Sequence, residues 1–162
     1  MNGEYLKAMD SETFYAAAEP YLKKALTKDF DLHRIAEMVR TRIEVYPDIP
    51  EMVAFFEQVP EYDIALFTNK KAKTDAEKSL ATLKDLLPRL EASEDFTNDA
   101  LFEMLKAYTQ ENGCKVNAVM WPLRIAVSGQ SVTPAGATEI MDIIGKDESI
   151  ARIRAAIEKL EA

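Results

Sequence analysis

The spacing of the apolar residues constrains the fold most, because they recur at steps of three and four residues along almost the whole chain. Such spacing places them on one face of a helix, whereas a half-buried strand alternates apolar and polar residues. None of the 162 residues form a convincing strand pattern, and there is no internal repeat. The sequence therefore predicts an all-α fold.

Capping and turn residues divide this pattern into separate helices. Ser11 is expected to cap the first helix, and Pro20 inside it predicts a kink or a break. Pro50 is expected to open a third short helix, and a later helix is bounded by Thr97 and Gly113.

The last fifty residues contain the most turn signals. Pro122 biases the preceding tryptophan away from helical geometry, so we expect a short helix at 116–121 and a new turn from Pro122 to Ser128. Thr133 and Pro134 resemble a helix start, and Asp147 is expected to cap the final helix.

Residues 57–73 change in character and separate two groups of helices. They combine a turn-like segment with the short apolar patch Ile64–Phe67 and the polar run Thr68–Lys73. A chain of this length holds one ordinary domain or two small ones. We therefore expect two helical subdomains, 1–66 and 67–162.

Several classes of protein are excluded by what the sequence lacks. Five glycines and no Gly-rich phosphate-loop motif argue against dinucleotide-binding and P-loop folds. A single cysteine, Cys114, forms no internal disulfide, and with the single histidine, His33, it makes no zinc cluster. No nucleophile with an activating base is evident, so a free-standing enzyme is disfavoured.

The net charge of −8 argues against a generic nucleic-acid binder, which usually carries a basic surface. The acidity lies mostly in residues 1–96, with 13 Lys and Arg against 19 Asp and Glu, while the counts from Gly113 onward are even. Any RNA site must therefore be confined to a small part of the surface. The N-terminus has no signal-peptide pattern and no run of 18 apolar residues occurs, which predicts a soluble, cytoplasmic chain.

Basic residues at three places are candidates for contact with RNA. The run Asn69–Lys73 is expected either to contact phosphate or to form a solvated linker. Arg40 and Arg42 end the second helix, where cations also stabilise the helix dipole. Arg124 follows a rigid Trp-Pro-Leu segment that would hold it firmly, and Trp121 itself either anchors the core or stacks on a base. The residues alone leave these alternatives open.

One motif gives the chain a family resemblance. Residues 121–129, WPLRIAVSG, followed by Thr133-Pro134, resemble the C-terminal anticodon-binding region of bacterial-type glutamyl-tRNA synthetases. The segments Ile143–Glu148 and Arg152–Leu160 are also similar to that family, and Asn2–Leu6 looks like the start of its anticodon-binding region.

The resemblance implies an α-helical cage of two subdomains that grips the anticodon loop of tRNA(Glu). Arg42 matches an arginine that discriminates the third anticodon base, and Arg124 matches the motif arginine that faces the anticodon. Thr133 and Pro134 match a loop that contacts anticodon bases and backbone, and Arg40 is implied as a phosphate contact.

The chemistry of Arg42 agrees with that role. Unpaired cytosine offers the acceptors N3 and O2, which suit a guanidinium fork, whereas guanine offers N–H donors at the corresponding positions. The glutamate and glutamine anticodons differ at this base, C against G. An arginine there is expected to favour tRNA(Glu) by about 1–3 kcal/mol.

The resemblance does not extend to the catalytic part of the family. The sequence has no counterpart of the HIGH or KMSKS elements, so we expect no catalytic residue, metal or cofactor in this chain and no activity of its own. ATP and Mg²⁺ are expected in a separate catalytic domain of the parent ligase, joined in cis to a monomeric module that binds neither DNA nor membrane. The alternative is a helical protein-interaction module whose acidic surface binds a basic protein.

Overall fold

The computed structural model describes residues 8–162, and the predicted resemblance at Asn2–Leu6 lies outside them. Helices account for the regular structure within this range, and its only strand-like feature is an isolated antiparallel bridge between Asn69 and Thr74. The predicted all-α class is therefore confirmed. No helix among residues 8–162 is long and apolar enough to cross a membrane.

The chain divides into two compact units. The first runs up to Val59 and includes Thr133–Ala135, and the second comprises Pro60–Val132 and Gly136–Ala162. The sequence suggested a boundary between residues 66 and 67. Residues 60–66 belong instead to the second unit, because the 3₁₀ helix η2 (Ile64–Phe67) packs against α5 and α7 of that unit.

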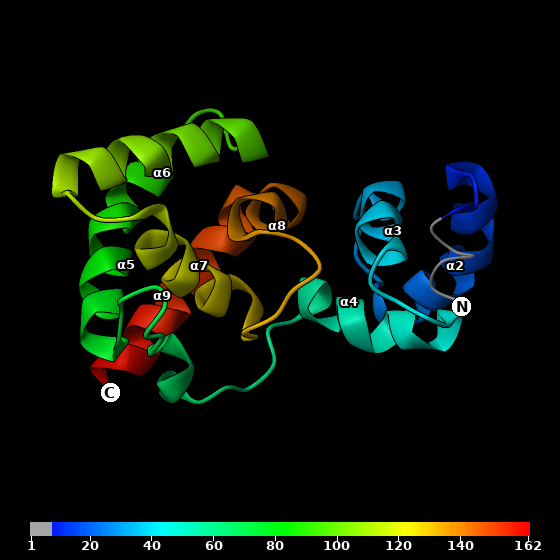
Figure 1. The fold of residues 1–162 in the computed structure, drawn as a ribbon, viewed down its shortest axis with the longest axis horizontal. Helices are drawn as coiled ribbons and strands as arrows, with labels where there is room; N and C mark the ends of the chain where they lie inside the picture. The colour runs from blue at the N-terminus through cyan, green and yellow to red at the C-terminus, as the bar shows by residue number, and fades with distance from the viewer. Residues whose placement is uncertain (1–7) are drawn as a thin grey trace. The chain divides into compact units, whose positions relative to one another are not determined.

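The first unit contains α2 (Ser11–Ala25), α3 (Leu32–Arg40), the 3₁₀ turn η1 (Tyr46–Asp48) and α4 (Ile49–Glu57), drawn in blue to cyan in Figure 1. α2 contacts each of the other three elements. Their apolar faces bury Phe14, Leu22, Ile35, Val39, Val53 and Phe56. This burial is what the helical spacing of the sequence predicted.

Two details of α2 differ from the prediction. Asp10, and not Ser11, is the N-cap, because its carboxylate accepts a hydrogen bond from the backbone N–H of Thr13 at 2.8 Å. The break predicted as one possible effect of Pro20 is absent, because the helix continues through the proline, and the kink stays a prediction. Phe14 and Leu22 are fully buried on either side of the proline, and this packing offsets the lost backbone hydrogen bond.

The second unit adds η2 and five α-helices, drawn in green to red in Figure 1. These helices are α5 (Ala76–Ala92), α6 (Asn98–Asn112), α7 (Val116–Ser128), α8 (Ala137–Ile144) and α9 (Lys146–Glu161). α7 contacts all four other α-helices as well as η2. It is therefore the central helix of this unit.

The predicted break before Pro122 is wrong, since α7 is one helix from Val116 to Ser128. A proline inside a helix costs about 3 kcal/mol. Here the helix is surrounded by packed neighbours, and Pro122 and Leu123 are buried among them. The apolar area buried by these residues outweighs the local preference of the Trp-Pro pair.

The predicted helix starts after α7 are also wrong in detail. α8 begins at Ala137 with Gly136 as its N-cap. Thr133 does not cap this helix, since its hydroxyl donates to the carbonyl of Ala135 instead. α9 begins at Lys146, so Asp147 lies in its first turn and is not the cap.

We predict that Gly129→Ala destabilises the second unit more than Gly113→Ala does. Both glycines have left-handed backbone angles, with φ of 66° and 63°, so a side chain costs about 1–2 kcal/mol at either. Only at Gly129 does an added Cβ meet neighbours, at 3.0 Å from Tyr62 Cδ1 and 3.1 Å from the Pro60 carbonyl oxygen. Urea unfolding should show a further loss of about 1–3 kcal/mol for Gly129→Ala. Equal losses at the two positions would contradict this account of the close contact.

Candidate functional site

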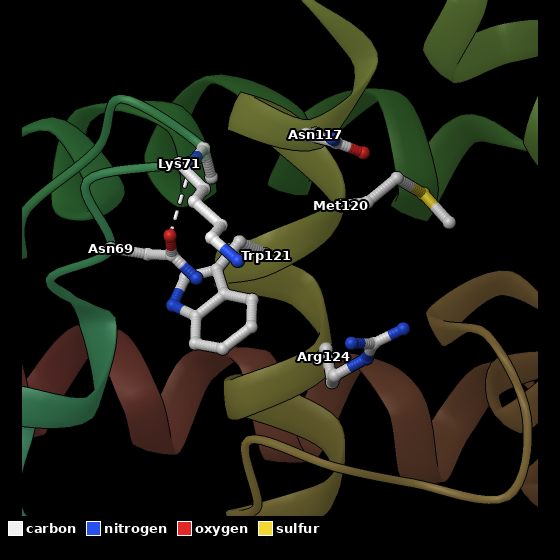
Figure 2. A pocket seen from close by; sticks show the side chains of 7 residues that line it. Asn69, Lys71, Asn117, Met120, Trp121 and Arg124 are labelled. Atoms are coloured by element: carbon white, nitrogen blue, oxygen red, sulfur yellow. Dashed lines mark hydrogen bonds between the residues drawn. The ribbon is translucent and has the colours of Figure 1, made fainter.

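One face of α7 and the loop after η2 line a pocket of about 220 Å³ (Figure 2). The helix contributes Asn117, Met120, Trp121 and Arg124, which occupy positions i, i+3, i+4 and i+7 and so share one face. The loop contributes Asn69, Lys71 and Ala72. The polar groups of this lining are two amides and two cations, and none of the seven residues is acidic.

Trp121 and Arg124 form the centre of this pocket. The indole Nε1–H of Trp121 donates to the backbone carbonyl of Leu66 at 2.8 Å, which fixes the orientation of the ring. The guanidinium carbon of Arg124 lies 6.0 Å from the centroid of that ring, within the range of a cation–π contact. Trp121 is half-buried, so it anchors η2 to α7 and still contributes to the pocket wall.

Arg152 holds the C-terminal end of α7 in place, and the sequence gave no functional reason to single it out. Its guanidinium Nη1 donates to the carbonyl of Val127 at 2.6 Å, and its Nε donates to Glu148 Oε1 at 2.9 Å. Burial lowers the pKa of this guanidinium, and the Glu148 carboxylate opposes that shift. Two sequence signals involve this residue: the Glu148–Arg152 pair is spaced for contact on one helix face, and Arg152 begins the segment Arg152–Leu160 that is similar to the synthetase family.

The structure places Thr133 and Pro134 in buried positions. Thr133 is only 6% exposed, and its hydroxyl is used in the hydrogen bond to Ala135. Pro134 is buried as well, and both residues group with the first unit. Their predicted contact with anticodon bases stays a prediction.

Arg40 and Arg42 differ sharply although both lie at the end of α3. The side chain of Arg40 is 11% exposed; its Nη1 is 3.2 Å from Glu37 Oε1 and its guanidinium carbon is 5.7 Å from the Phe14 ring centroid. Arg42 follows the helix in a turn, where its N–H donates to the carbonyl of Val39 at 2.8 Å and its side chain is exposed. Arg42 is thus accessible to a ligand, whereas Arg40 serves the packing of its own unit.

The single histidine and cysteine show no catalytic arrangement. His33 is exposed and its ring stacks on Tyr15 with centroids 3.6 Å apart, and Cys114 is exposed in the other unit. Within residues 8–162, no group of three His, Cys, Asp or Glu side chains is placed to hold a metal ion.

A helical module with a basic, aromatic and acid-free pocket has the composition of a single-stranded RNA site. The family model described as an anticodon binding domain matches residues 13–157, so the chain belongs to the anticodon-binding domain family. Its relatives are glutamate–tRNA ligases. The protein of Lachnoclostridium phytofermentans is 53% identical over 162 residues, which cover 100% of this chain and 33% of that protein. The Clostridium acetobutylicum protein is 49% identical, with coverage of 99% and 33%.

Solved structures give the same result. A glutamate tRNA ligase from Elizabethkingia meningosepticum, crystallised in complex with its amino acid, superposes with a TM-score of 0.84 at 26% identity. The match covers 98% of this chain and 31% of that chain. The predicted resemblance to glutamyl-tRNA synthetases is thereby confirmed. The chain spans about a third of the length of these relatives.

We predict that Trp121→Phe destabilises the second unit by about 1–2 kcal/mol, because it leaves the Leu66 carbonyl without its indole donor. Urea unfolding followed by circular dichroism measures this, since the substitution removes the only tryptophan. An unchanged free energy of unfolding would show that the hydrogen bond does not anchor η2 to α7.

Proposed function

We propose that this chain recognises the anticodon loop of tRNA(Glu) and positions that tRNA for glutamylation by a catalytic domain in cis. The observation that carries the proposal is the pocket on α7, where Arg124 lies over the indole of Trp121 inside an acid-free lining. A guanidinium and an aromatic face together suit an unpaired base, which needs hydrogen-bond donors at its edge and an apolar contact at its face. Membership of the anticodon-binding family adds support.

Within this proposal, Arg42 discriminates the third anticodon base. Its exposed position in the turn after α3 leaves the guanidinium accessible to a ligand. A cytosine presents two acceptors to that fork, while a guanine presents donors that repel it.

The remaining residues take smaller parts in the proposal. Thr133 and Pro134 contribute to the anticodon contact mainly through backbone groups of their loop, because their side chains are buried. Arg40 is proposed as a phosphate contact in addition to its packing role. Only the small exposed part of its side chain is available for that contact.

The parent ligase would act in the cytoplasm as an ATP-dependent enzyme. ATP, Mg²⁺ and glutamate would bind to its catalytic domain, and this chain would supply no group to the chemistry. A monomer suffices for the proposed recognition, since each tRNA presents one anticodon loop.

The proposal is tested by titrating the purified chain with tRNA(Glu) and with the same transcript carrying G at the third anticodon base. We expect tighter binding to the natural transcript, and weaker binding of both at higher salt because phosphate contacts release counterions. No binding to either transcript, together with capture of a defined basic protein, would favour the protein-interaction alternative.

We predict that Arg42→Gln reduces the preference for the natural third base by about five- to a hundredfold, the equivalent of about 1–3 kcal/mol. The free energy of unfolding should stay within about 0.5 kcal/mol of the wild type because the side chain is exposed. Arg154→Gln, at an exposed arginine paired with Glu91, is the matched control. Equal discrimination by wild type and Arg42→Gln would contradict the role of Arg42.

A further inference from the structure

The loop that carries Lys71 is an ordered hairpin turn and not a loose linker. Asn69 and Thr74 exchange both backbone hydrogen bonds, at 2.9 and 3.1 Å, and the N–H of Lys73 donates to the carbonyl of Lys70 at 3.2 Å. The side chain of Asn69 closes the turn from inside by accepting from the N–H of Ala72 at 3.0 Å.

Two further contacts fix this turn to the second unit. Ala72 is only 6% exposed, so the tip of the loop packs inward. The hydroxyl groups of Thr74 and Ser79 lie 3.3 Å apart in a buried position, which joins the end of the turn to α5. A lysine on such a turn loses little further backbone entropy when it binds a ligand.

The turn gives its three lysines different surroundings. Lys71 lines the pocket with Trp121 and Arg124, while Lys70 and Lys73 do not line it. Figure 2 shows the side chain of Lys71 reaching from the loop toward the indole, with Arg124 further along α7. All three lysines are exposed, so none of them is needed for the core.

The charge of this pocket is unusual for the chain. The protein carries a net charge of −8, yet Lys71 and Arg124 line one small hollow without a carboxylate among its lining residues. Lys71 and Arg124 thus bring two positively charged side chains to one hollow, where a bound anion gains attraction from both. A compact ammonium group suits a phosphate as a point charge, and a guanidinium adds directed hydrogen bonds.

We propose that Lys71 binds a backbone phosphate of single-stranded RNA beside Arg124, and that the hairpin turn presents it for this contact. The inference rests on the proposed function and adds a binding residue to it. Lys71 holds the strand through a sequence-independent charge contact, while Arg124 and Trp121 face the adjoining nucleotide.

The test compares Lys71→Ala with Lys70→Ala, which removes the same charge from the same turn outside the pocket. Each full-length variant is titrated with the tRNA(Glu) transcript and its third-base G variant over a range of salt concentrations. We expect Lys71→Ala to weaken binding of both transcripts equally, by about three- to tenfold. The slope of log K against log salt should be shallower by about 0.7. Lys71→Arg should restore most of the affinity, and Lys70→Ala should have less than half the effect.

The outcomes separate this inference from the proposed function. Equal effects of Lys70→Ala and Lys71→Ala, or no effect of either, would overturn the phosphate contact while leaving anticodon recognition intact. Binding that ignores the third base but still depends on Lys71 more than on Lys70 would support the contact and count against base recognition. No RNA binding by the wild type at the lowest salt would overturn both. Unchanged thermal unfolding of the variants shows that they are folded.

Discussion

The burial of α7 is the constraint on which the second unit depends. This helix contacts α5, α6, α8, α9 and η2, so most of its surface is covered by neighbours. Its C-terminal end carries carbonyl groups without helical partners, and such groups are costly to bury unless a donor reaches them. Arg152 supplies that donor to Val127 from α9. The cost of burying the guanidinium is offset by this hydrogen bond and by the carboxylate of Glu148.

The candidate site follows from what this burial leaves uncovered. The face of α7 that lines the pocket carries Asn117, Met120, Trp121 and Arg124. Because the other faces of the helix are packed, the positions of these side chains are fixed before any ligand binds. Pro122 lies next to this face, and its ring restricts the backbone between Trp121 and Arg124. A binding site on such a scaffold loses little entropy on association.

Sequence reasoning succeeded where a single local signal decided the structure. The apolar spacing predicted the helices, and Gly113 ended α6 as expected because its φ of 63° suits glycine. The reasoning failed at Pro122 and at Thr133-Pro134, where local preference competed with tertiary burial and lost.

The pocket itself could not be predicted from the sequence. It joins Lys71 to Trp121 across fifty residues of sequence, and only packing brings such residues together. Arg124 and the run Asn69–Lys73 were each identified, but not their contact with a common hollow.

The acidity of the chain gives the positions of its accessible cations more influence over how RNA binds. A net charge of −8 repels a phosphate backbone over about one Debye length, which is about 10 Å at 0.1 M salt. Nonspecific attraction, the usual source of RNA affinity, is therefore weak for most of this surface. Binding is favoured where cations gather on the surface, as in the pocket lined by Lys71 and Arg124. The surrounding negative charge thus disfavours complexes in which RNA lies elsewhere on the surface. The orientation of the bound RNA is therefore selected by repulsion as well as by contact.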